Sequence, residues 1–254
     1  MPIKAILFDL WETLICETAD LKIEWNKQRL TAFREIFQNW DSNISLEKIQ
    51  NSYFLVHNEL KSIQRSKLLV VPPQTQVELI LSSMKIVPYG FPPDLMAKLI
   101  QAYISATLNP IPILMPGVKK TLNSIKSFGL NIGLVSNTWS TPGSILRDIL
   151  REYNIAEYFA LTLFSDEVGY PKPHKLIFQE ALNHFPGIEP PEFAFVGDDY
   201  YCDIYGAKKV GFTTVWLCRD DQEYQRYASN GKNYSDYRIT ALFELPTLLS
   251  ADIC

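Results

Sequence analysis

The chain has 254 residues and a formal net charge of −4 at pH 7, and hydrophobic side chains occupy 47% of its positions. This length suits an α/β core together with a second, smaller unit. No run of Lys or Arg offers a positive stripe to a phosphate backbone, so we expect no nucleic-acid partner. The four cysteines form no CxxC pair, which argues against a zinc site and against a disulfide framework.

The sequence gives no membrane or secretory signal. No stretch approaches the roughly 18 apolar residues that a membrane span needs. No charged leader followed by an apolar segment precedes the first apolar run. We therefore expect a soluble, cytoplasmic protein with no membrane partner.

The first predicted element is a short buried strand over residues 3–8, at the start of the stretch "ILFDLWETL". Asp9 follows this strand directly. Ligands of open α/β sheets bind in the crevice outside the carboxyl ends of the strands, which makes Asp9 a candidate for chemistry. Taken alone, a strand-end Asp that only hydrogen-bonds its own turn is the simpler interpretation.

Helices are predicted next, because glycine is absent from residues 1–89 and apolar residues recur at helical spacing. Ser45 is the expected N-cap of the second helix, and Pro72-Pro73 and Pro92-Pro93 begin two more. Four such helices would form a small bundle. Its core would come from three stripes: Ile23, Leu30, Phe33, Phe37 and Trp40; Leu46, Ile49, Tyr53, Val56 and Leu60; and Leu95, Leu99, Tyr103 and Ala106.

Beyond the proline-rich linker "NPIPILMPG", strands and helices alternate. Strands are predicted in "LNIGLVS", "ALTLFS", "FAFVG" and "FTTVWL", and helices at residues 116–127, 142–153, 175–184 and 203–210. The predicted fold class is α/β: a Rossmann-like parallel sheet core flanked by helices, with a helical-bundle cap domain inserted after the first strand. We expect residues 1–16 and 112–254 to form the catalytic core, and residues 17–111 to form a cap over the strand ends.

Polar residues follow four of the predicted strands. They are Asp9, the pair Ser136-Asn137, the pair Asp166-Glu167, and the pair Asp198-Asp199, and Lys172 comes soon after the third strand. Each has a simple explanation as a turn, cap or solvated residue. In combination they place a carboxylate, a hydroxyl, an ammonium and an acidic cluster at one edge of one sheet, which indicates a catalytic site.

These motifs, in this order, resemble the haloacid dehalogenase superfamily. "ILFDLWETL" is similar to its nucleophile motif, "GLVSN" to its hydroxyl motif, "SDEVGYPKPHKLIF" to its lysine motif, and "FVGDDYYCDIYGAKKVG" to its acidic motif. The resemblance covers the whole chain, and four motifs in order are far more specific than any one of them. It implies the same core and inserted cap, and a phosphatase-like member of the superfamily.

The resemblance also implies a role for each residue. Asp9 would attack phosphorus and form an aspartyl-phosphate, which water then hydrolyses. The Lys172 ammonium and the Ser136 hydroxyl would stabilise the charged transition state. Asn137 would be a second phosphoryl contact, and Thr13 would orient the Asp9 loop.

The implied cofactor is Mg²⁺, which prefers oxygen ligands. Its expected ligands are the carboxylates of Asp9 and Asp198 and the backbone carbonyl of Trp11. Asp203 and Asp199 would support these ligands from behind. The expected substrate is a small phosphorylated metabolite.

The chain departs from the family pattern at Trp11, where most phosphatases of this family have a second Asp that protonates the leaving oxygen. Indole has no proton that titrates near neutral pH, so Trp11 cannot take this role. General acid–base help is typically worth about 10² to 10⁴ in rate. Three outcomes are then open. A substrate with a good leaving group would need little protonation. Alternatively, His57, Glu24 or the adjacent Glu12 could supply the proton, or the site could bind its ligand without turnover.

Two alternatives to the phosphatase therefore stay open. Dehalogenases of the superfamily carry an aromatic residue at the position of Trp11 and displace halide without a metal. They have Ser and Asn where this chain has "GDD", and Tyr where it has Phe178, and both differences favour the metal-dependent branch. The second alternative is a catalytically weak binder of a phospho-ligand or protein that keeps the metal site.

Overall fold

The computed structural model describes residues 2–228 and 233–253. The chain divides into two compact units. Unit 1 comprises residues 1–16, 113–137 and 150–254, and unit 2 comprises residues 17–112 and 138–149. Most of unit 2 is inserted in the chain after the first strand, and the unit also takes in the segment that directly follows Asn137.

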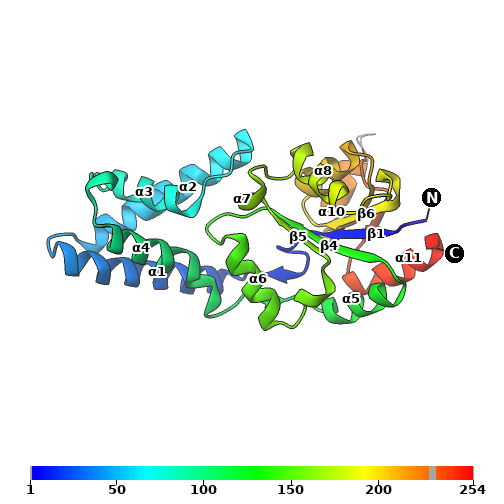
Figure 1. Cartoon of the computed structure of the whole chain (residues 1–254), viewed down its shortest axis with the longest axis horizontal. Helices are drawn as coiled ribbons and strands as arrows, with labels where there is room; N and C mark the ends of the chain where they lie inside the picture. The colour runs from blue at the N-terminus through cyan, green and yellow to red at the C-terminus, as the bar shows by residue number, and fades with distance from the viewer. Residues whose placement is uncertain (1, 229–232, 254) are drawn as a thin grey trace. The chain divides into compact units, whose positions relative to one another are not determined.

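Unit 1 is built on a six-stranded parallel sheet (Figure 1). Its strand order is β5-β4-β1-β6-β7-β8, so the first strand of the chain lies in the middle of the sheet. The strands are β1 (Ala5–Phe8), β4 (Asn131–Ser136), β5 (Leu161–Phe164), β6 (Phe193–Gly197), β7 (Thr213–Leu217) and β8 (Tyr237–Ile239). Because they are parallel, their carboxyl ends meet at one edge.

Helices flank this sheet, which completes the predicted Rossmann-like α/β core. Helix α8 packs on β4 and β5, whereas α5 contacts β4 and α11; Figure 1 shows α5 and α11 on the opposite side of the sheet from α8. Apolar side chains of α8, such as Ile177 and Phe178, join Leu7, Val135 and Phe195 of the strands in one buried cluster. The helices of this part of the chain are α5 (Val118–Ser127), α6 (Gly143–Glu152), α7 (Ser165–Val168), α8 (Lys175–His184), α9 (Gly206–Lys209), α10 (Asp221–Ala228) and α11 (Leu245–Ile253).

A small antiparallel pair lies at the chain crossings between the units. Strand β2 (Ile15–Cys16) pairs with β3 (Ile113–Leu114), so the end of the first crossing strand lies beside the start of the return strand. The sequence predicted only a linker over residues 109–117, the segment that contains β3. Two residues per strand are too few for a periodic pattern to show in the sequence.

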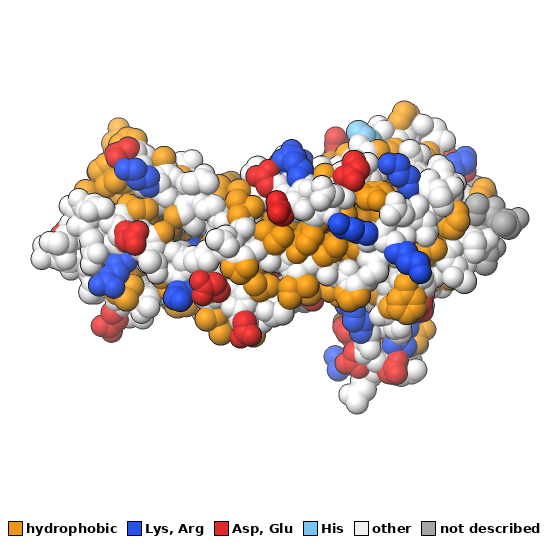
Figure 2. Space-filling model, turned by 90° about the horizontal axis from the view of Figure 1, so that it is seen from below, with side chains coloured by type: hydrophobic (Ala, Val, Ile, Leu, Met, Phe, Trp, Pro, Cys, Tyr) orange, Lys and Arg blue, Asp and Glu red, His pale blue; other side chains and the backbone are white. Residues whose placement is uncertain are grey.

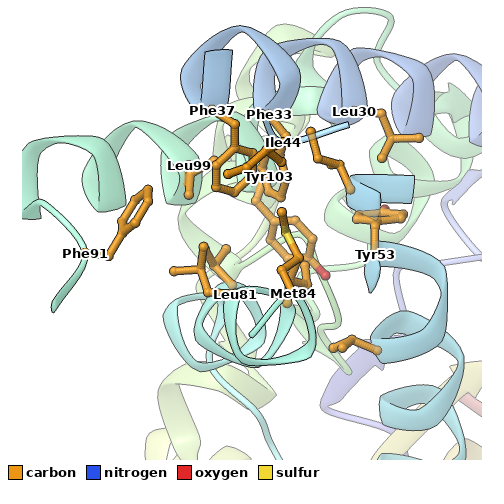
Figure 3. Packing of buried hydrophobic residues seen from close by; sticks show 14 of the residues in the cluster. Leu30, Phe33, Phe37, Ile44, Tyr53, Leu81, Met84, Phe91, Leu99 and Tyr103 are labelled. Atoms are coloured by element: carbon orange, nitrogen blue, oxygen red, sulfur yellow. The ribbon is translucent and has the colours of Figure 1, made fainter. Parts of the chain in front are cut away.

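The inserted part of unit 2, residues 17–112, contains four α-helices: α1 (Ala19–Trp40), α2 (Leu46–Lys67), α3 (Pro73–Ser83) and α4 (Pro93–Ser105). Helix α1 packs against α2 and α4, and α3 packs against the same two partners, which gives the predicted bundle. Figure 3 shows its core, where Phe33 and Phe37 from α1 meet Leu99 and Tyr103 from α4. Ser45 caps α2 as predicted, since its hydroxyl accepts a hydrogen bond from the Lys48 N–H at 3.2 Å.

The segment after Asn137 is held to unit 2 by buried polar contacts. The Gln76 side chain donates to the backbone carbonyl of Trp139 at 2.9 Å, and the Arg29 guanidinium donates to the Ser140 hydroxyl at 3.2 Å. Both Arg29 and Gln76 are buried. Buried polar groups need partners, so these contacts fix the segment where it lies.

Three sequence expectations need correction. The helix predicted at residues 203–210 begins earlier, as a π-helical turn over Tyr200–Tyr205 that continues into α9. Ile23 and Trp40, expected in the bundle core, are 66% and 39% exposed. Both lie near the ends of α1, a 22-residue helix that outruns the 13-residue α4 on which it packs.

Charged side chains of both signs are interspersed on the face of the molecule seen in Figure 2. Across residues 2–228 and 233–253, none of the helices combines the length and the apolar composition that crossing a bilayer requires.

Candidate active site

Asp9 lies directly after β1, where the backbone is fixed by the sheet. Its N–H donates to the carbonyl of Val196 at 2.9 Å, which continues the pairing of β1 with β6 by one residue. The residue is 6% exposed, and one carboxylate oxygen accepts a hydrogen bond from the Lys172 ammonium at 2.5 Å. A carboxylate this deeply buried needs such a cation to stay ionised.

Lys172 is the central cation of the site and is 2% exposed. Its ammonium contacts Asp9 at 2.5 Å and Asp203 at 2.7 Å, and it lies 5.2 Å from the centre of the Phe195 ring. Burial opposes the charge on Lys172, but Asp203 and Asp9 more than offset this and raise the pKa of the ammonium. Lys172 is therefore a permanent positive charge near neutral pH.

The backbone of Lys172 is held by Asn137. The side-chain oxygen of Asn137 accepts from the Lys172 N–H at 2.7 Å, and its amide nitrogen donates to the Lys172 carbonyl at 3.0 Å. Both polar ends of this side chain are thus engaged with one residue. Ser136, which precedes it, is fully buried and donates to the Asn137 carbonyl at 3.2 Å.

The acidic turn follows β6. Asp199 caps the π-helical turn, because its carboxylate accepts from the N–H groups of Tyr201 and Cys202 at 2.9 and 2.8 Å. Its own N–H donates to the Asp203 carboxylate at 3.0 Å. These three hydrogen bonds fold the turn back, and Asp203 then faces Lys172 rather than solvent. π-helical turns are frequent at functional sites.

Gly197, the last residue of β6, permits this approach. A Cβ atom at this position would overlap the carboxylate of Asp203. Glycine within a strand often marks a place where another group comes close. Gly197 was not among the predicted site residues, although its position directly before an acidic pair was a signal for such a role.

The carboxylates of Asp9, Asp198 and Asp203 form a cluster that could hold a cation. One oxygen from each lies within 4.8 Å of the others. With all groups ionised, three carboxylates and the Lys172 ammonium leave two uncompensated negative charges. A divalent ion would neutralise them, and an all-oxygen donor set is the kind that Mg²⁺ prefers. The donor set therefore fits the expected metal.

The pKa values of these carboxylates reflect the same excess of negative charge. Burial, with a smaller contribution from the nearby charge of Asp9, raises the pKa of Asp198 to about 7. Burial also raises the pKa of Asp9 and of Asp203, against the opposing attraction of Lys172. A cation in the cluster would shift all three back toward ionisation.

The turn after Asp9 carries the remaining predicted residues, of which Thr13 contacts the charged centre. Thr13 is fully buried, and its hydroxyl donates to the Asp198 carboxylate at a long 3.4 Å. Glu12 adopts a left-handed backbone conformation with φ of 55°, and its carbonyl accepts from the Arg219 guanidinium at 3.1 Å. Trp11 is half-buried and forms a backbone bridge with Ile15.

The structure thus gathers most of the predicted site residues in unit 1. Asp9, Lys172, Asp198 and Asp203 form the charged centre; Thr13, Asn137 and Asp199 contact it directly, and Ser136 is linked to it through Asn137. Asp166 and Glu167 occupy the short helix α7 instead. Trp216 was missed: its indole N–H donates to the Asp198 carbonyl at 2.9 Å, and nothing in the strand pattern of "FTTVWL" pointed to this contact.

Comparisons with known proteins agree with this arrangement. Residues 3–211 match the family described as haloacid dehalogenase-like hydrolase. Glyceraldehyde 3-phosphate phosphatase of Pyrococcus furiosus is 38% identical over 135 residues, which is 53% of this chain and 52% of that protein. The chain thus spans about half the length of this curated relative.

Solved structures share the fold. A HAD phosphatase from Thermococcus onnurineus has a TM-score of 0.64 at 22% identity, covering 99% of this chain and 100% of that one. A 2-haloacid dehalogenase from Pseudomonas syringae also has a TM-score of 0.64, at 21% identity and with 98% and 99% coverage. Phosphatase and dehalogenase are thus equally close in fold. The sheet order, the charged centre after its strands and the match over residues 3–211 show that the chain belongs to the haloacid dehalogenase-like hydrolase family.

Proposed function

We propose that the chain is a Mg²⁺-dependent phosphatase of small phosphorylated metabolites in which Asp9 is the nucleophile. The observation that carries this proposal is the buried centre of three carboxylates around one ammonium, with two negative charges left over. Without a metal, Asp203 would still pair with Lys172, but the Asp198 carboxylate would be repelled by Asp9 with no cation of its own to offset the repulsion.

In this proposal each site residue has a separate task. Asp9 attacks phosphorus through a carboxylate oxygen and becomes an aspartyl-phosphate, which water then hydrolyses. Lys172 already contacts Asp9, and its ammonium stabilises negative charge that develops on the phosphoryl oxygens. The Ser136 hydroxyl turns from the Asn137 carbonyl to a phosphoryl oxygen when substrate binds.

Asp9 and Asp198 would hold the Mg²⁺ ion, together with the backbone carbonyl of Trp11. Bound there, the ion would supply charge neutralisation and orient the phosphoryl group. Asp203 supports this centre through its ion pair with Lys172 at 2.7 Å. Asp199 acts through the turn that it caps, and Thr13 through its hydroxyl on Asp198.

Asn137 has a different task from the phosphoryl contact expected from the sequence. Both ends of its amide bind the backbone of Lys172. We therefore assign Asn137 to positioning the ammonium. Its contact with substrate would require giving up one of these two hydrogen bonds.

The missing acid at Trp11 sets the expected substrate preference. Without a proton donor at this position, esters with good leaving groups react well and alkyl esters react slowly. The relative from Pyrococcus furiosus carries the name glyceraldehyde 3-phosphate phosphatase, which supports a small phosphorylated substrate.

The proposal also includes a catalytic core of residues 1–16 and 112–254, a cap of residues 17–111 and a cytoplasmic location.

The test is hydrolysis of p-nitrophenyl phosphate with Mg²⁺ and with EDTA. We expect release of p-nitrophenol with Mg²⁺, none with EDTA, and none from Asp9→Asn with either. Asn keeps the size of the side chain and removes the nucleophilic charge. An Asp94→Asn variant, which makes the same exchange at an exposed position of α4, serves as a matched control and keeps its activity.

Two other results would overturn the proposal in different ways. Chloride release from 2-chloropropionate in EDTA would favour the dehalogenase alternative, which the aromatic side chain of Trp11 suggests. Mg²⁺ binding without turnover of any phosphate ester, including after Trp11→Asp, would favour a binding protein that keeps the metal site.

A further inference from the structure

We propose that Trp216 is a positioning residue for the metal centre: its indole N–H holds the peptide that carries Asp198. This inference rests on the proposed function, because it concerns the affinity of the same carboxylates for Mg²⁺. Trp216 touches neither substrate nor metal. It acts only through the backbone of Asp198.

The contact is direct, and its donor is buried. Trp216 lies on β7 opposite Gly197 of β6, so its side chain starts one residue away from Asp198 on the neighbouring strand. Its Nε1 donates to the Asp198 carbonyl at 2.9 Å, and the residue is fully buried. Removal of this donor takes a protein partner from the Asp198 carbonyl and leaves it without a group that fixes its direction.

The peptide between Asp198 and Asp199 is held at both of its polar ends. Its carbonyl accepts from Trp216 at 2.9 Å, and its N–H donates to the Asp203 carboxylate at 3.0 Å. A peptide unit is planar, so two fixed ends fix the plane. The direction in which the Asp198 side chain leaves the backbone is then set, and Asp198 and Asp203 are tied together through one rigid group.

The indole itself cannot turn away, because aromatic side chains surround it. Tyr200, Tyr227 and Tyr224 have ring centres 4.7, 5.6 and 5.9 Å from that of Trp216. Tyr200 is the first residue of the π-helical turn that carries Asp203. Trp216 therefore contacts the segment that carries Asp198 and the segment that carries Asp203.

Side chains that orient metal ligands from behind typically change metal affinity by about 10- to 100-fold when they are altered. We expect Trp216→Phe, which keeps an aromatic ring and removes the donor, to weaken Mg²⁺ binding by about 10-fold or more. At saturating Mg²⁺ the variant regains most of its kcat. The KM for substrate at saturating Mg²⁺ stays near that of the unaltered chain.

The chain offers a matched control in unit 2. The indole of Trp25 donates to the carbonyl of Pro110 at 2.7 Å and is also buried. Trp25→Phe thus removes the same kind of hydrogen bond at a comparable depth. It should lower the urea midpoint about as much as Trp216→Phe does, while leaving Mg²⁺ affinity unchanged.

The experiment measures Mg²⁺ affinity by titration calorimetry, with Mn²⁺ as a second probe, on both variants and on the unaltered chain. A selective loss in Trp216→Phe supports the proposal. Equal affinity in Trp216→Phe and the unaltered chain, or equal losses in both variants, overturns it. An unaltered chain that binds neither ion overturns the metal centre itself, and this inference with it.

Should Trp216→Phe fail to fold, benzothienylalanine at position 216 gives the same test. Its sulfur replaces the N–H and leaves ring size and packing almost unchanged. Weaker Mg²⁺ binding by this folded variant supports the proposal. Unchanged binding overturns it.

Discussion

Asp198→Asn should make the metal-free protein more stable near neutral pH while removing its response to Mg²⁺. The reason is that Asp198 is held in a site too rich in carboxylates. Burial and the charge of Asp9 raise the pKa of Asp198 from 3.8 to about 7. Asparagine has nearly the same size, still accepts the Thr13 hydroxyl, and carries no charge to be repelled.

The size of the effect follows from linkage between protonation and folding. The folded chain keeps the Asp198 proton between about pH 4 and pH 7, where the unfolded chain has already lost it. Stability from this group is therefore fully present below pH 4 and is lost as pH rises through 7. Each pKa unit corresponds to about 1.4 kcal/mol, so the upper limit of the loss is about 4 kcal/mol. Because Asp198 is only half-buried, solvent screens part of this effect, and we expect about 2–4 kcal/mol at pH 8.

Urea unfolding in EDTA at pH 5 and pH 8 measures this directly. Asp198→Asn should exceed the unaltered chain by about 2–4 kcal/mol at pH 8 and by less than half of that at pH 5. Added Mg²⁺ should then raise the stability of the unaltered chain and leave the variant almost unchanged. A variant that is less stable than the unaltered chain at pH 8 in EDTA would refute the reasoning.

Three further outcomes are expected. Trp11→Asp should raise kcat for alkyl phosphates by about 10-fold or more and change aryl phosphate turnover little, because only the poorer leaving group needs a proton; equal effects on both esters in a steady-state assay would contradict this. Glu12 has a φ of 55°, which disfavours a branched side chain. In urea unfolding, Glu12→Gly should therefore leave the protein as stable or up to about 1 kcal/mol more stable, whereas Glu12→Val should destabilise it by about 2 kcal/mol. Gly197→Ala should displace Asp203 from Lys172 and cost about 3 kcal/mol with loss of Mg²⁺ binding, and retention of both stability and binding would show that the close approach does not matter.

Strong local patterns explain why much of the fold could be predicted. The strand "FAFVG" and the helix at residues 175–184 match β6 and α8 at every residue. Parallel strands then bring Asp9 and Asp198 to one edge whatever the details of packing. This is why residues so far apart in the chain could be assigned to one site.

Other features depend on contacts that no local pattern encodes. The π-helical turn arises because Asp199 caps it and exchanges hydrogen bonds with Asp203. A π-helix differs from an α-helix by one residue in its backbone hydrogen-bond spacing, and this difference does not show in the hydrophobic periodicity of so short a segment. The link from Trp216 to Asp198 requires β6 and β7 to be neighbours in a given register. Helical spacing identifies the apolar face of α1, but it does not show where the partner helices end. For this reason Ile23 was predicted to lie in the core, whereas it is exposed.

The central claim is that Asp9 takes up the phosphoryl group. Its most direct test is an acid quench during turnover of a phosphate ester with Mg²⁺, followed by mass spectrometry of the peptide that contains residue 9. We predict one added phosphoryl group on Asp9, absent in EDTA and absent from Asp9→Asn. Rapid turnover with no phosphorylated peptide at any quench time, or with the group on another residue, would contradict the account.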